Sequence, residues 1–149
     1  MALGMARNVA HVAAPPERVF AVLHDAATYA DWVVGTQAVR ATDRDWPAPG
    51  SRLHHSVGIG PLHVDDHTEI LESAPPHRLV LLARTRPLGT ARVELDLAPE
   101  AGGTRVTMIE DPGDRWSRLL WNPLVHVLVR VRNAESLRRL RRLVERPAR

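Results

Sequence analysis

The sequence predicts an α+β protein in which a run of antiparallel strands precedes one long C-terminal helix. From Gln37 to Pro112, apolar and polar residues alternate with period two between breaks rich in Pro and Gly, which is typical of strands joined by short loops. From Pro123 to Glu145 the apolar residues follow a helical period. The chain has 149 residues, 44% of them hydrophobic and 25% charged. We therefore expect residues 1–149 to form a single globular domain.

The N-terminal part predicts one strand and two short helices. Arg7–Ala14 alternates like a strand, and Pro15 and Pro16 end it because proline cannot donate to a β-ladder. Val19–Leu23 has the spacing of a helix, and so does Tyr29–Val34. With this first strand, the meander predicts a sheet of about seven strands.

The clearest strand runs from Ala91 to Ala98, where apolar and polar side chains alternate. This pattern predicts a strand that is buried on one face and wet on the other. The long helix has Asn122 as its N-cap and Pro123 in its first position. One apolar stripe follows this helix, and it consists of Val129, Leu137, Leu140 and Val144.

Four segments, in this order, resemble the START-like (SRPBCC) superfamily, which includes polyketide cyclases and lipid-transfer proteins. They are APPERVF at 14–20, Asp25 with Tyr29 and Trp32, Glu72 with PPHRL at 75–79, and GGTRVT at 102–107. The resemblance covers nearly the whole chain. It implies a helix-grip fold, in which a curved antiparallel sheet wraps around the long C-terminal helix and leaves a ligand cavity between them. It does not imply one activity, because this fold hosts carriers, sensors and enzymes.

The basic residues are all arginine and gather at the C-terminal end. Residues 114–149 contain ten Arg and three acids, whereas residues 1–113 contain ten Arg and fourteen acids. No aromatic residue lies among Arg138, Arg139, Arg141 and Arg142, so we expect a solvated helix end and no nucleic-acid binding. No apolar run approaches the roughly 20 residues of a membrane span, and no signal peptide is evident. These features predict a cytoplasmic protein without stable membrane insertion, and they leave its oligomeric state open.

A predicted hairpin around Gly60 and Pro61 contributes the sharpest candidate site. A two-residue loop would place His55 opposite Asp66, and Val57 opposite Val64, on the inner face of the sheet. Asp66 could then orient His55 and favour its charged form, and His55 would act as a general base or acid. The alternative is a buried His–Asp pair with a purely structural role.

Two further polar residues fall on predicted inner faces. Glu110 follows Val106 and Met108 in the alternation, so it is either a polar anchor or acid–base group of the cavity, or a strand-end carboxylate in water. Asn133 interrupts the helical stripe and either bonds to the sheet or contacts a ligand. His63, Asp65 and His67 share one face of a strand, but that face is the predicted wet one. We therefore predict no metal site and no cofactor.

The leading hypothesis is a protein that binds or carries a small hydrophobic molecule, polyketide-, lipid- or isoprenoid-like, between the sheet and the long helix. The alternative is a polyketide cyclase, aromatase or dehydratase that uses His55, Asp66 and Glu110 as acid–base groups. Both hypotheses share one set of cavity residues, which are Leu53, His55, Val57, Val64, Asp66, Leu81, Val93, Leu95, Met108, Glu110, Val129, Asn133 and Leu137.

Overall fold

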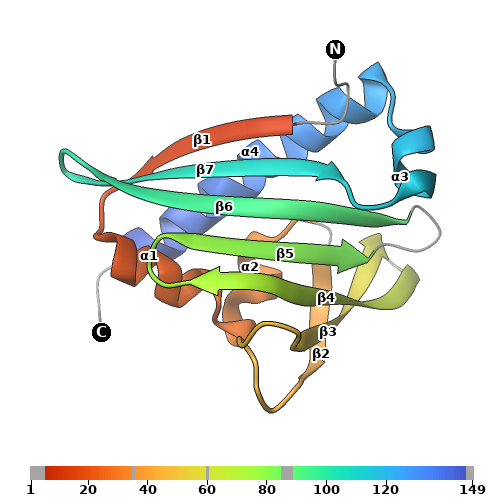
Figure 1. Ribbon diagram of the computed structural model, residues 1–149, viewed down its shortest axis with the longest axis horizontal. Helices are drawn as coiled ribbons and strands as arrows, with labels where there is room; N and C mark the ends of the chain where they lie inside the picture. Colours follow the sequence, from red (N-terminus) through yellow and green to blue (C-terminus); the bar gives the residue numbers. More distant parts are fainter. Residues whose placement is uncertain (1–5, 35, 60, 85–88, 147–149) are drawn as a thin grey trace.

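The computed structural model describes residues 6–34, 36–59, 61–84 and 89–146. Its main element is a seven-stranded antiparallel sheet with the strand order β1-β7-β6-β5-β4-β3-β2 (Figure 1). The strands are β1 (Ala6–Val12), β2 (Thr36–Thr42), β3 (Arg52–Ile59), β4 (Leu62–Ala74), β5 (Arg78–Arg84), β6 (Thr90–Glu100) and β7 (Gly103–Pro112). The predicted α+β class and strand number are confirmed.

Short helices follow the first strand, and a long helix ends the fold. They are α1 (Pro16–Leu23), a 3₁₀ turn (Ala26–Thr28), α2 (Tyr29–Trp32), α3 (Arg115–Leu120) and α4 (Pro123–Glu145). Asn122 caps α4 as predicted, because its Oδ1 accepts a hydrogen bond from the backbone N of Val125 at 3.0 Å. In the part of the chain that the structure describes, no helix is both long and apolar enough to cross a membrane.

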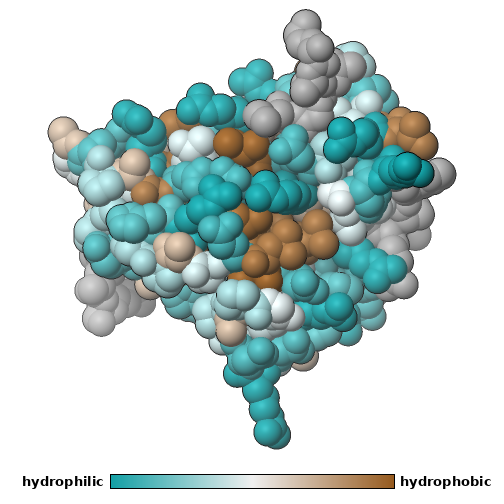
Figure 2. Space-filling model, in the orientation of Figure 1, coloured by the Kyte–Doolittle hydropathy of each residue, from teal (hydrophilic) through white to brown (hydrophobic). Residues whose placement is uncertain are grey.

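The sheet wraps around α4, which runs behind the strands in Figure 1 and packs mainly against β1. α4 also contacts α1 and α2, so the short helices close the space between the helix and the far edge of the sheet. The outer face of the sheet is mostly hydrophilic (Figure 2). On this face Arg78 bonds to Glu72, Glu94 and Asp96 at 3.0–3.1 Å and so ties β4, β5 and β6 together.

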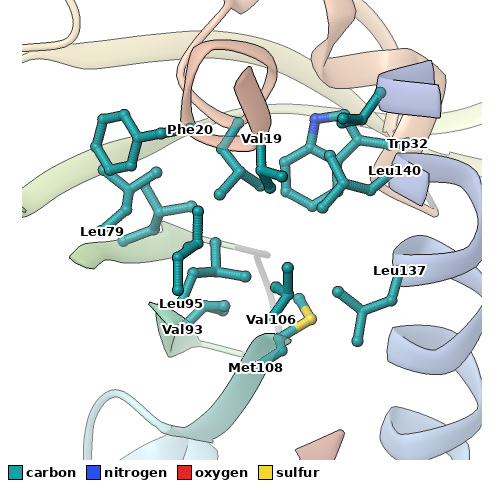
Figure 3. Close-up of a cluster of buried hydrophobic side chains, with 14 of the residues drawn as sticks. Val19, Phe20, Trp32, Leu79, Val93, Leu95, Val106, Met108, Leu137 and Leu140 are labelled. Atoms are coloured by element: carbon teal, nitrogen blue, oxygen red, sulfur yellow. The ribbon is translucent and has the colours of Figure 1, made fainter. Parts of the chain in front are cut away.

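The hydrophobic core lies between the inner face of the sheet and the helices. Figure 3 shows Val106 and Met108 of β7 facing Leu137 of α4, with Leu140 of α4 beside Trp32. The alternation predicted for β6 is confirmed, because Val93, Leu95 and Leu97 are buried and the intervening charged residues are half-buried. The helical stripe is confirmed at Leu137, Leu140 and Val144, all at most 2% exposed, whereas Val129 is half-buried.

The backbone register of the β3–β4 hairpin is the predicted one. His55 lies opposite Asp66, and Val57 lies opposite Val64. Both His55 and Asp66 are at most 3% exposed, so this part of the hairpin directs its polar pair inward, as the apolar neighbours indicated.

Candidate functional site

A small cavity of about 50 Å³ lies between the inner face of the sheet, α2 and α4. Its walls come from β3 to β7, from α2 and the residues after it, and from the middle of α4. The lining residues are Tyr29, Trp32, Val33, Val34, Thr36, His55, Thr68, Leu81, Ala83, Val93, Met108, Arg132, Asn133 and Ser136. Apolar walls with a few converging polar groups are typical of small-molecule sites.

A buried chain of three polar side chains forms one wall of the cavity. The Tyr29 hydroxyl lies 3.1 Å from Thr68 Oγ1, which in turn lies 2.9 Å from His55 Nε2. The rings of Tyr29 and His55 are stacked, with their centroids 5.8 Å apart. All three residues are at most 4% exposed. The chain is therefore held in place both by hydrogen bonds and by packing.

Burial keeps both rings of this chain neutral at pH 7. Desolvation lowers the pKa of His55 from 6.5 to about 4, and the nearby Asp66 only partly opposes this effect. Desolvation likewise raises the pKa of the Tyr29 hydroxyl above 10.0. A neutral imidazole has one N–H and one acceptor nitrogen, so the chain has a direction.

Either direction of the chain leaves one donor unused. If Tyr29 donates to Thr68 and Thr68 donates to His55 Nε2, the imidazole proton is on Nδ1. If His55 donates to Thr68 and Thr68 donates to Tyr29, the Tyr29 hydroxyl proton is the one left over. Among the described residues, His55 Nδ1 is buried and has no hydrogen-bond partner. The first direction makes this nitrogen the unused donor, and the second makes it an unused acceptor.

Among the described residues Asp66 does not bond to His55, although its charge favours the protonated imidazole as predicted. Its Oδ1 accepts a hydrogen bond from the backbone N of His67 at 3.0 Å and lies 3.8 Å from Arg84 Nε. Neither nitrogen of His55 bonds to it within the described part of the chain, since Nε2 pairs with Thr68 and Nδ1 has no partner. Residues directly opposite in a ladder need not bond, because a short Asp side chain can turn back to its own backbone.

Glu110 is not the wet strand-end carboxylate that one interpretation of the sequence offered. Its side chain is 4% exposed, and its Oε1 accepts hydrogen bonds from Arg132 at 2.8 Å and from Asn133 Nδ2 at 3.1 Å. Arg132 was not a predicted site residue, because it lies at the edge of the apolar stripe of α4. Asn133 thus bonds to the sheet, as one interpretation of the sequence expected, and it also lines the cavity.

Other donors of the cavity wall also lack partners among the described residues. Trp32 Nε1 and Arg132 Nε are buried without a hydrogen bond. Ser136 Oγ accepts from the backbone N of Val34 at 3.1 Å, which leaves its own hydrogen free to donate. Indole and guanidinium nitrogens only donate, so the cavity is rich in donors and poor in free acceptors.

The remaining predicted cavity residues fall into distinct places. Leu81, Val93 and Met108 line the cavity, together with His55 and Asn133. Leu53, Leu95 and Leu137 instead pack in the surrounding core and are at most 2% exposed. The expected inward position of Val64 is wrong, because it is 39% exposed. It lies near the tip of the hairpin, while α4 packs mainly on β1 at the opposite edge of the sheet. The side chain of Val57 is outside the described residues.

Several lining residues could have been found from the sequence. Thr68 lies two residues after Asp66 and therefore shares its face of β4. Arg132 and Ser136 lie one turn apart on α4, on the same side as Asn133. A run of polar residues inside an otherwise apolar helix stripe is the signal that marks them.

The predicted absence of a metal site remains a prediction. The rings of His54 and His67 lie 6.2 Å apart between centroids and are tilted by 58° to each other, and Asp65 is exposed. No group of three or more His, Cys, Asp or Glu in the described part of the chain is arranged to hold a metal ion. The side chain of His63 lies outside that part.

Solved structures of other proteins share this architecture. A Nitrosomonas europaea protein is 18% identical, with a TM-score of 0.74 over 97% of this chain and 96% of that chain. A Thermus thermophilus protein is 19% identical, with a TM-score of 0.71 over 94% and 96%. BexL, a di-domain ARO/CYC protein from the BE-7585A biosynthetic pathway, is 16% identical, with a TM-score of 0.71 over 97% of this chain and 50% of its own. Identities this low show the fold alone.

A curved sheet gripping a long helix, with a cavity between them, defines a helix-grip protein of the START-like class, as the resemblance implied. Residues 6–145 match the sequence profile of the polyketide cyclase / dehydrase and lipid transport family. The chain belongs to this family. No protein with a curated description matches the sequence.

Proposed function

We propose that this protein binds a small, mostly apolar molecule with one or more carbonyl-type oxygens, in the cavity between the sheet and α4. The observation that carries this proposal is the set of buried donors without partners, on side chains that line an otherwise apolar cavity. They are Trp32 Nε1 and Arg132 Nε, together with His55 Nδ1 in the direction of the chain that puts the imidazole proton there.

The energetics favour a ligand with acceptor oxygens over a pure hydrocarbon. Leu81, Val93 and Met108 supply apolar surface, which is worth roughly 25 cal/mol per Å² buried. A buried donor without a partner costs about 1–3 kcal/mol, so an acceptor placed against it recovers part of that free energy. Among the classes of hydrophobic ligand that the sequence suggested, polyketide-like molecules contain several such oxygens.

The size of the cavity requires a change in the protein on binding. About 50 Å³ is well below the roughly 150 Å³ of a cavity that accepts benzene. A ring-sized ligand therefore binds to a conformation in which α4 or α2 lies farther from the sheet. Such a conformation is a minor state that the ligand makes populated.

A titration with two ligands of similar shape tests the proposal. We expect acetophenone, followed by NMR chemical shifts, to bind at least tenfold more tightly than ethylbenzene, which lacks the oxygen. Ala83→Leu fills the cavity and should abolish binding, whereas Ala98→Leu, at an exposed alanine of β6, should not. Equal affinity for the two ligands, or binding that survives Ala83→Leu, would refute the proposal.

The cyclase or dehydratase alternative rests on His55 as an acid–base group. Two features favour binding without catalysis. A histidine with a pKa of about 4 is a weak base at neutral pH, and its partner is Thr68 rather than a carboxylate. Turnover of an aromatic polyketone by the wild type, lost in His55→Gln, would support the enzyme instead. The cytoplasmic location stays a prediction from the sequence.

A further inference from the structure

The first turns of α4 expose apolar residues where a helix in water normally carries polar ones. Leu124, Val127, Leu128 and Val131 are between 55% and 68% exposed. Their spacing of i, i+3, i+4 and i+7 places them on one stripe, on the side of the helix opposite its buried stripe. Leu119 and Leu120 at the end of α3 are 79% and 37% exposed. We name these six residues the α3–α4 apolar surface.

The same segment carries only positive charge. Residues 115–134 contain four Arg and no Asp or Glu. Arg115, Arg118 and Arg130 are exposed, and none of them forms an ion pair with a described residue. Beyond this segment the outer side of α4 becomes polar, because Glu135 pairs with Arg138 and Arg139 at 3.3 Å.

These features gather at one end of the molecule. Figure 1 places α3 and the beginning of α4 together there, beyond the end of β7. In Figure 2 an apolar area lies over α3 and borders hydrophilic surface. The apolar residues and their arginines therefore belong to one local surface rather than to scattered positions.

We propose that the α3–α4 apolar surface docks on an anionic phospholipid membrane. Its Leu and Val side chains would enter the interface between headgroups and acyl chains, and Arg115, Arg118 and Arg130 would meet the lipid phosphates. A second copy of the chain is the less favourable partner, because it would bring the same arginines face to face. This contact goes beyond ligand binding in the cavity and requires no membrane-spanning segment.

Vesicle sedimentation tests the proposal directly. We expect the protein to bind vesicles of equal parts phosphatidylglycerol and phosphatidylcholine at least tenfold more strongly than vesicles of phosphatidylcholine alone. In 0.5 M NaCl, where the Debye length is only about 4 Å, binding to the anionic vesicles should fall at least tenfold.

Paired variants separate the apolar contribution from the charged one. Leu124→Ser with Leu128→Ser should lower vesicle binding at least tenfold. Arg118→Gln with Arg130→Gln should do the same, because each arginine near an anionic surface contributes about fivefold. The controls are Val9→Ser with Leu71→Ser, and Arg44→Gln with Arg142→Gln. They change exposed residues elsewhere and should keep binding within about threefold of wild type.

Three results would overturn the proposal. The first is no preference for anionic vesicles, and the second is an equal loss of binding in the control variants. The third is a dimer, detected by light scattering, that Leu124→Ser with Leu128→Ser dissociates, since the surface would then bind a second copy. Acetophenone affinity should be unchanged in every one of these variants, so failure here is distinguishable from failure of the proposed ligand site.

Discussion

Protonation of His55 is opposed by its burial, which lowers the pKa from 6.5 to about 4. Between pH 6.5 and pH 4, His55 is protonated in the unfolded chain but stays neutral in the folded protein. The free energy of unfolding therefore falls as the pH drops from 6.5 to 4, by about 3 kcal/mol from this residue. Above pH 6.5 both states are neutral at this position, and the contribution is constant.

Urea denaturation at pH 7 and at pH 4 checks this effect. We expect the wild type to lose about 3 kcal/mol more between these pH values than His55→Phe, which cannot titrate. The comparison removes the contribution of the carboxylates, because both proteins share them. Equal losses of unfolding free energy in the two proteins would show that protonation of His55 does not destabilise the fold.

Glu110 and Arg132 form an asymmetric pair, since the carboxylate is 4% exposed and the guanidinium is 39% exposed. Arg132→Leu leaves a buried charge with Asn133 as its remaining partner and should destabilise the fold by about 3 kcal/mol. Glu110→Gln leaves an arginine that reaches water and should cost only about 1 kcal/mol. Chemical denaturation measures both values. Arg142→Leu, at an exposed position, serves as the control and should change stability by less than about 0.5 kcal/mol.

For these individual residues, the sequence predicted the face of the sheet better than it predicted the hydrogen-bond partner. Alternation placed His55, Asp66 and Glu110 on the inner face correctly, because the side-chain period of a strand is fixed by its backbone. The hydrogen bonds differ from the expected ones. His55 bonds to Thr68, and Glu110 bonds to Arg132 on α4. The choice of hydrogen-bond partner among nearby groups depends on side-chain rotamers and on the position of the helix. The periodicity of a sequence predicts neither of these.

The long helix α4 has a buried side and an exposed side, and both sides carry leucine. Leu140 is fully buried and Leu128 is 59% exposed. Leu140→Ala should destabilise the protein by about 2–5 kcal/mol, because it leaves a cavity in a packed core. Leu128→Ala removes a side chain that already contacts water and should cost less than about 0.5 kcal/mol. Thermal or urea unfolding of the two variants, compared at one pH, measures the difference, and similar losses would contradict this orientation of α4.

Elements with strong local signals were predicted well. Asn122 and Pro123 fix the start of α4, whose bounds match the prediction. The alternation from Ala91 predicted β6, which extends one residue further at its start and two at its end. α3 was not predicted. Its six residues are too short to show a period, and its cap, Asp114 with Ser117, resembles many loop sequences. The hydrogen bonds from Thr90 to Asp114 hold this helix to the start of β6, and such a long-range contact leaves no mark in local sequence.

For the molecule as a whole, the order of elements predicted the α+β class, and the resemblance was needed to predict the architecture. A strand, two short helices, a meander and a long helix leave few ways to bury one sheet face, and the resemblance selected the helix grip among them. The dimensions of the cavity could not be predicted in this way. They depend on how far the side chains of Trp32, Met108 and Arg132 extend between the sheet and the helices. The conformation of each of these side chains depends on its packing against its neighbours.

The narrowness of that cavity has a consequence for rates. Under the proposed function, a ligand larger than the existing space enters only while the walls stand apart. At high ligand concentration the observed association rate then levels off at the rate of wall opening, which is a property of the protein alone. Different cargoes of suitable shape would share this limit and differ in how long they stay bound. The protein would thus select among ligands by their dissociation rates rather than by their association rates.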